Sequence, residues 1–210
     1  MQYLIFLTIF VVLADWSQIW LFVEPLIKPS VKKIKLKNKE ILRTIKEKSG
    51  LHLNSIIVIE SEKMYGGMSG IPGRPQMILS SKLIKTLDKG ELEYVLLHEA
   101  AHFKYSHPVI LGISQIALIG LGIYLVREAS FIITAIIGVT FGLFFIQIAR
   151  ITERAAENFS ASHMSDPKYM LGAVNKFEKE WSNISLPKLR KLLSWNISYK
   201  EKRKIAMKYV

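Results

Sequence analysis

Two long apolar runs, separated by only three residues, constrain the fold of this chain more than any other feature. Residues 108–126 and 130–149 hold no charged side chain, and only Arg127, Glu128 and Ala129 lie between them. A run of about 20 apolar residues is long enough to cross the hydrocarbon core of a bilayer as a helix. The pattern therefore predicts a transmembrane helical hairpin. The alternative is a pair of helices buried in a soluble core, but a chain of 210 residues could hardly cover them.

A third apolar run opens the chain. Residues 1–23 contain a single charged side chain, Asp15. The competing interpretation is a cleaved signal peptide, which needs a positively charged start, whereas the first basic residue here is Lys28. We therefore expect a retained helix, and about three transmembrane helices in all.

Positive charge is distributed unevenly around these runs. All but one of the 29 Lys and Arg residues fall in residues 27–107 and 150–210, and Arg127 is the exception. Cytoplasmic segments next to transmembrane helices carry an excess of Lys and Arg. The distribution predicts a multi-pass protein of the cell membrane with both polar parts on the cytoplasmic side. The formal charge of +12 then points to the lipid bilayer as a partner rather than to nucleic acid, for which no motif is visible.

These patterns predict a mainly α membrane protein with a small cytoplasmic α+β domain. We expect an N-terminal transmembrane helix in residues 1–26 and a polar part in residues 27–106. Residues 107–149 would form the transmembrane hairpin. Residues 150–210 would form a cytoplasmic helical part that returns to the first polar part, because the hairpin crosses the membrane twice.

Short apolar segments in the first polar part predict a small sheet. Residues 55–60 are typical of a strand, and residues 76–80 of a second one. Residues 64–75 contain four glycines and predict a mobile loop between them. We expect Met77, Ile78 and Leu79 to form an edge strand, to which an extended peptide can add.

One motif carries recognisable chemistry. Residues 98–102 read His-Glu-Ala-Ala-His, and Asp88 with Glu91 three residues later predicts the capped start of a helix around them. Two histidines four residues apart share a helix face and can bind one zinc ion. Glu99 beside them can take a proton from the attacking water. The chain has no cysteine, so a metal here must be held by His, Asp or Glu.

A catalytic zinc normally takes a third protein ligand. The metzincin pattern is excluded because Tyr105 and Pro108 stand where it requires Gly and His. Glu153, at the cytoplasmic end of the hairpin, is the best candidate for the third ligand. Glu157, one helical turn later on the same face, could accept a hydrogen bond from a ligand imidazole. His107 follows His102 by five residues, and we expect it off the ligand face.

Taken together, the segments resemble the M48 peptidases, in particular HtpX-like membrane zinc metalloproteases. The resemblance is carried by three features: residues 97–102 continuing to His107-Pro108, the hairpin that follows, and residues 150–157 (Arg-Ile-Thr-Glu-Arg-Ala-Ala-Glu). It implies that residues 27–106 form a catalytic part, a domain of the gluzincin type, and that Glu153 is the zinc-binding glutamate. Substrates of zinc peptidases often add as a strand beside the site, so the edge strand at Met77, Ile78 and Leu79 would bind substrate. Two departures are that Glu157 stands where the family has Asp, and that the family's late His-Pro-x-x-x-x-Arg segment is poorly matched around Asn196 and Lys202.

The resemblance implies an endopeptidase with one Zn²⁺ per chain that cleaves membrane or membrane-associated proteins, in keeping with a role in protein quality control. Alternatives are a catalytically inactive membrane scaffold and a signalling protease of the M56 type, although no sensor domain fits within this length. An intramembrane protease of the site-2 type would bury the motif helix in lipid. Glu91, Glu93 and Lys104 on or near that helix favour water instead.

Overall fold

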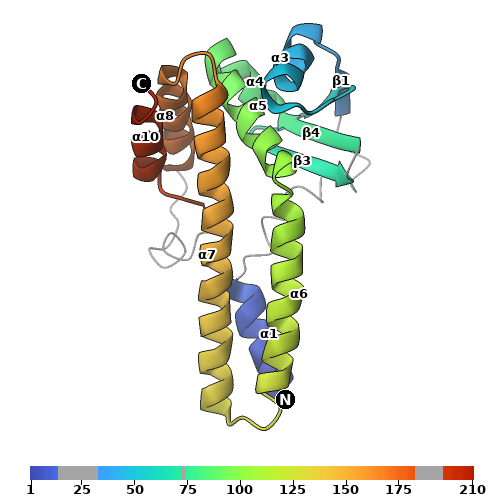
Figure 1. Ribbon diagram of the computed structural model, residues 1–210, viewed down its shortest axis with the longest axis vertical. Helices are drawn as coiled ribbons and strands as arrows, with labels where there is room; N and C mark the ends of the chain where they lie inside the picture. The colour runs from blue at the N-terminus through green and yellow to red at the C-terminus, as the bar shows by residue number, and fades with distance from the viewer. Residues whose placement is uncertain (14–32, 72–73, 183–195) are drawn as a thin grey trace.

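The computed structural model describes residues 1–13, 33–71, 74–182 and 196–210. A long bundle of three helices carries a mixed α/β part and two further helices at one end (Figure 1). The N-terminus lies near the turn that joins α6 to α7, and the C-terminus lies at the opposite end of the molecule. The protein is thus mostly helical with one small sheet, as predicted.

The elements follow one another in a simple order. The bundle is formed by α1 (Gln2–Leu13), α6 (His107–Leu125) and α7 (Phe131–His163). The mixed part comprises β1 (Lys33–Leu36), α3 (Lys39–Ser49), β2 (Ile56–Ile59), β3 (Gly66–Ile71), β4 (Arg74–Ser80), α4 (Ser81–Thr86) and α5 (Lys89–Lys104). The C-terminal helices are α8 (Lys168–Ser182) and α10 (Tyr199–Met207).

Helices α6 and α7 occupy the predicted hairpin. Within the described residues, they are the two helices long and apolar enough to cross a membrane, judged by length and composition. Most of their apolar side chains point outward, among them Ile116, Ile132 and Phe144. An outward apolar surface of this kind is expected where lipid, rather than protein, surrounds a helix.

Helix α1 packs in the groove between α6 and α7. Phe6 and Phe10 are fully buried there, with Phe6 in edge-on contact with Phe141. Gly122 of α6 lies directly under the Phe6 ring, where any larger side chain would collide with it. Small residues allow this close approach between membrane helices. The first predicted span runs to residue 23, and its second half lies outside the described residues, so the expected total of three spans stays a prediction.

The sheet has the strand order β1-β2-β4-β3, with β2 and β4 parallel and the outer pairs antiparallel. β2 confirms the strand predicted in residues 55–60. The prediction that Met77, Ile78 and Leu79 form an edge strand is wrong, because β4 pairs with β2 on one side and β3 on the other. All three side chains are buried in the centre of the sheet.

The predicted glycine-rich loop contains β3, one of the two edge strands of the sheet. Glycine has a low strand propensity, and the surroundings of Gly66 explain why it is present in this strand. A Cβ atom at Gly66 would lie 3.2 Å from a methyl group of Leu79 and 3.4 Å from one of Val95 on α5. Glycine therefore lets β3 pass close to α5, beside the histidine motif.

Helix α5 begins at the predicted cap. The Asp88 side chain accepts from the Glu91 backbone N–H, and the Glu91 side chain accepts from the Asp88 N–H, which makes a complete capping box. The helix runs through the main core, with Val95, Leu97 and Ala101 buried. This packing on several sides fixes the rotation of α5, and so the direction in which its histidines point.

Candidate metal centre

His98 and His102 lie on one face of α5, as their spacing predicts. Their Nε2 atoms are 3.2 Å apart. Both side chains are largely buried, at 11% and 16% exposure. The two rings thus present converging nitrogen atoms to a small protected space.

Helix α7 supplies a carboxylate to the same space. This helix is a single run of 33 residues, or about 50 Å at 1.5 Å per residue, and its last third emerges beside α5 (Figure 1). Glu153 lies there, with Oε1 3.4 Å from His102 Nε2 and Oε2 3.8 Å from His98 Nε2. The structure therefore brings together the three residues predicted as ligands, with their ligand atoms within 4.8 Å of one another.

These separations match the geometry of one tetrahedral metal ion. Two ligand atoms at 2.0–2.2 Å from zinc and at a tetrahedral angle lie about 3.3–3.6 Å apart. The observed 3.2, 3.4 and 3.8 Å fall close to that range. Two histidines and one glutamate are also a donor set found in catalytic zinc sites. The residues present therefore fit a zinc ion.

Burial controls the protonation of the two histidines. It lowers the pKa of His98 well below the ordinary value, with neighbouring positive groups adding to the effect. It also lowers the pKa of His102, to about 3. A lowered histidine pKa keeps the ring neutral near pH 7, and a neutral ring is the form that binds a metal. Both rings are thus prepared for coordination.

Glu99 lies beside the same space on the β3 side. A Cβ atom added at Gly66 of β3 would lie 3.6 Å from Glu99 Cγ. Burial, and next the charge of Glu153, raises the pKa of Glu99 to about 8. A carboxylate with a raised pKa is a better proton acceptor, which suits the role of general base.

Glu157 lies one turn beyond Glu153 and is fully buried. Its Oε1 is 3.5 Å from His98 Nδ1, its Oε2 accepts a hydrogen bond from the Tyr94 hydroxyl at 2.8 Å, and Lys202 Nζ of α10 lies 2.5 Å from Oε1. Burial alone would lower the pKa of Lys202, but the carboxylates of Glu157 and Glu153 raise it above its ordinary value. Lys202 therefore remains a charged partner.

Sequence reasoning did not find Lys202 or Tyr94. Tyr94 precedes His98 by four residues, so helical spacing could have placed it on the same face. Lys202 reaches the site because α10 packs beside it, and no local sequence pattern predicts this contact. Together they show that the C-terminal helix takes part in building the site.

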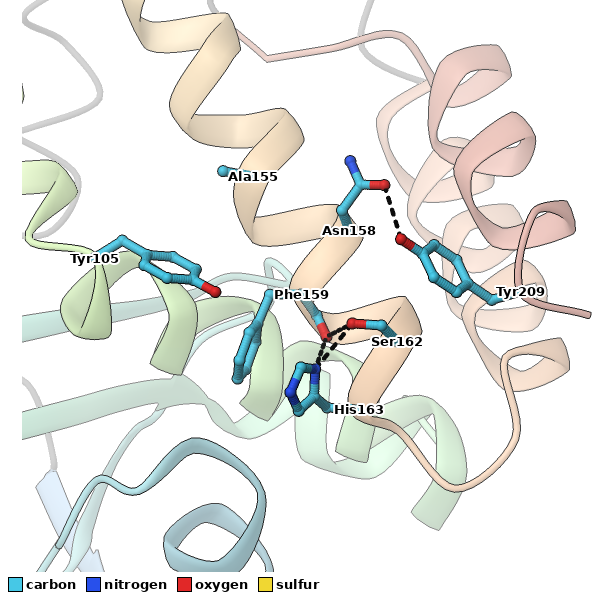
Figure 2. Close-up of a pocket in the computed structure, with 7 residues that line it drawn as sticks. All are labelled: Tyr105, Ala155, Asn158, Phe159, Ser162, His163 and Tyr209. Carbon is cyan, nitrogen blue, oxygen red and sulfur yellow. Dashed lines mark hydrogen bonds between the residues drawn. The ribbon is translucent and has the colours of Figure 1, made fainter.

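Two of the other three histidines, His107 and His163, lie in different places. His107 is buried and lies against His102, with their Nδ1 atoms 3.0 Å apart, a contact that the sequence did not predict. His163 lies elsewhere, on a pocket of about 350 Å³ between the end of α5, α7 and the C-terminus. Figure 2 shows it beside Phe159, with a hydrogen bond between its Nδ1 and Ser162 Oγ.

The fold and the site define a class of protein. A membrane metallopeptidase combines three parts that are present here. They are a histidine motif on one helix, a carboxylate at the end of a membrane-type hairpin, and a sheet edge beside them. The model of peptidase family M48 matches residues 34–193 of this chain. The chain belongs to the M48 peptidase family, as its sequence resemblance implied.

A solved structure has the same fold. The crystal structure of Ste24p from S. mikatae superimposes with a TM-score of 0.63 at 18% sequence identity. The match covers 93% of this chain and 55% of that chain, so the present chain spans little more than half of its length. A comparison with curated proteins finds no match.

Proposed function

We propose that this protein is a zinc-dependent endopeptidase of the cell membrane that cleaves membrane or membrane-associated proteins on the cytoplasmic side. The observation that carries the proposal is the set of separations between His98, His102 and Glu153, which are close to those expected around one tetrahedral ion. Membership of a peptidase family supports the same chemistry.

Each residue of the proposed site has a separate role. His98, His102 and Glu153 would hold the ion, which when bound supplies Lewis-acid activation of a water molecule and of the peptide carbonyl. Glu99 accepts the proton of the attacking water and passes it to the departing amine. Glu157 faces His98 Nδ1, so that the imidazole keeps its Nε2 lone pair directed toward the ion.

Substrate would bind along β3. Among the described strands, β3 pairs with β4 on one side and has no partner on the other. An edge strand offers unpaired backbone groups to an extended peptide. Because β3 passes Glu99 at Gly66, a peptide added to its outer side would carry its backbone past the proposed general base.

Membrane proteins are the proposed substrates because of where the ligands lie. Glu153 follows the apolar run of α7 by one helical turn, and His102 precedes α6 by a few residues. The site therefore lies next to the end of the bundle that we assign to the bilayer. An extended segment near a membrane surface would reach it without unfolding a soluble domain.

The test is a substitution that separates binding of the metal from catalysis. Glu99→Gln preserves size and removes the proton-accepting carboxylate. Purified in detergent, it should retain zinc as in the wild type and lose cleavage of casein and of membrane-protein substrates by at least about 100-fold. Its matched control, His98→Ala, should lose zinc and cleavage together.

Two results would contradict the proposal. Cleavage by Glu99→Gln at the wild-type rate would remove Glu99 from the chemistry. A wild-type protein that binds zinc but cleaves nothing would favour the inactive scaffold instead. Co-purification of membrane proteins with Glu99→Gln would identify the substrates.

A further inference from the structure

The link between α5 and α6 has an unusual backbone. Ser106 has φ 54° and ψ 32°, in the left-handed region, and is the one residue other than glycine with positive φ in the described part of the chain. A non-glycine residue rarely adopts this conformation unless its surroundings require it, and such residues cluster at functional sites. The turn ends α5 and starts α6 with His107.

The turn brings His107 back against α5. The His107 side chain is buried, at 3% exposure of the residue. Its ring meets the His102 ring edge-on, with centroids 4.9 Å apart and the planes at 82°. The two Nδ1 atoms are 3.0 Å apart, which is the length of a good hydrogen bond. One of these nitrogen atoms must therefore carry the proton and the other must accept it.

The position of the other ligands decides which nitrogen donates. His102 faces His98 and Glu153 through Nε2. A neutral imidazole that binds a metal through Nε2 carries its proton on Nδ1. His102 Nδ1–H thus donates to the lone pair of His107 Nδ1, and His107 carries its own proton on Nε2.

We propose that His107 is a positioning residue that fixes the tautomer and ring orientation of the metal ligand His102. The inference rests on the proposed zinc site. It gives each histidine ligand its own supporting partner, Glu157 for His98 and His107 for His102. Metal-binding histidines nearly always donate their second N–H in this way, and loss of the acceptor costs about 10–100-fold in metal affinity.

His107 is itself held in place from the other side. Tyr105 stacks on its ring with centroids 5.7 Å apart, and the same tyrosine packs edge-on against Phe159 of α7. Figure 2 shows the Tyr105 ring directed toward Phe159. This packing joins α5, α6 and α7 around the imidazole, so that the start of the hairpin sets the orientation of a residue at the site.

A role for His107 as a further metal ligand does not fit these contacts. Its close contact is to Nδ1 of His102, and Nδ1 lies on the other side of the imidazole ring from the ligand nitrogen Nε2. The group of side chains able to share one ion comprises His98, His102 and Glu153, without His107. His107 therefore acts through His102.

The test compares two substitutions at His107. Asparagine places an amide oxygen near the position of Nδ1 and can accept the same hydrogen bond, whereas phenylalanine fills the space without an acceptor. The zinc dissociation constant of each purified protein is measured by competition with a chromophoric chelator. We expect about 10–100-fold weaker binding for His107→Phe and a change of a few-fold at most for His107→Asn.

A second pair of substitutions leaves the imidazole in place. Ser106→Gly accepts the left-handed conformation freely, whereas Ser106→Val is strained in it and should displace His107. We expect weaker zinc binding for the valine variant only, which keeps the test decisive even if His107→Phe does not fold. Wild-type zinc affinity in His107→Phe, or in a folded Ser106→Val, would overturn the proposal. Loss of zinc from Glu153→Ala in the same assay tests the zinc site separately.

Discussion

Glu157 shows how much of the site depends on single buried residues. It is fully buried and faces His98, Tyr94 and Lys202 at once. Taking a carboxylate out of water is costly unless a charge or hydrogen bonds compensate it. Lys202 and the Tyr94 hydroxyl supply that compensation, and Glu157 Oε1 lies 3.5 Å from His98 Nδ1.

A prediction at this scale concerns the ion pair of Glu157 with Lys202. Lys202→Met leaves a buried carboxylate without its cation, so the free energy of unfolding should fall by about 3–5 kcal/mol. Lys202→Arg, which keeps the charge, should lose much less. Thermal and chemical unfolding in detergent would measure these changes, and the exposed Lys204→Met on the same helix is the control.

The same pair can be tested through zinc. Glu157→Ala should bind zinc about 10–100-fold more weakly than the wild type, because it loses the partner of His98. The effects of Lys202→Met and Glu157→Ala on stability should not add in the double variant, since both break one contact. Additive losses would show that the two side chains act independently.

The residues of the site differ in how far their roles can be predicted from the sequence. His98 and His102 follow from helical spacing alone. Glu153 follows from the hairpin, which must return the chain to the face it left. The contact of His107 with His102 does not follow from the sequence, because it depends on the left-handed backbone conformation of Ser106, which no local pattern predicts. Lys202 arrives through docking of α10, a long-range contact that depends on tertiary packing.

At the scale of elements, β3 and α7 determine the shape of the site. Helix α7 is continuous from the apolar run to the two carboxylates, so the part assigned to the membrane and the ligand Glu153 lie on one unbroken helix. Strand β3 was predicted as a loop because its glycines have low strand propensity. The close approach to α5 at Gly66 is a tertiary requirement that overrides that propensity.

A proline test in β3 follows from its place at the edge. Neighbouring residues of a strand direct their N–H groups to opposite sides, so proline at Met68 and at Ser69 removes one donor toward β4 and one toward the open side. The proline that removes the N–H on the open side leaves the hydrogen bonds between β3 and β4 intact. That variant should retain zinc and thermal stability but lose peptide cleavage. Normal cleavage by both variants would exclude substrate binding along β3.

At the scale of the whole molecule, the bundle separates two ends. The sheet, α8, α10 and the C-terminus lie at one end, and the N-terminus and the α6–α7 turn lie at the other (Figure 1). All but one of the Lys and Arg residues belong to residues 27–107 and 150–210, and the described parts of these segments include the sheet, α8 and α10 at the first end. Both observations favour a cytoplasmic catalytic part.

The topology that we expect has the N-terminus outside the cell and the C-terminus inside. A tag at each end, probed by protease in intact cells, should be removed at the N-terminus and protected at the C-terminus, and permeabilised cells serve as the control. A protected N-terminal tag in intact cells would mean that the first apolar run does not cross the membrane as a single helix.

The central proposal is that His98, His102 and Glu153 jointly hold one zinc ion. The most direct measurement is the zinc content per chain, by plasma emission, of wild type and Glu153→Ala purified side by side. Two histidines alone make an incomplete site, so we expect about one zinc per wild-type chain and nearly none in Glu153→Ala. Full zinc content in a folded Glu153→Ala would contradict the assignment of the third ligand and the function built on it.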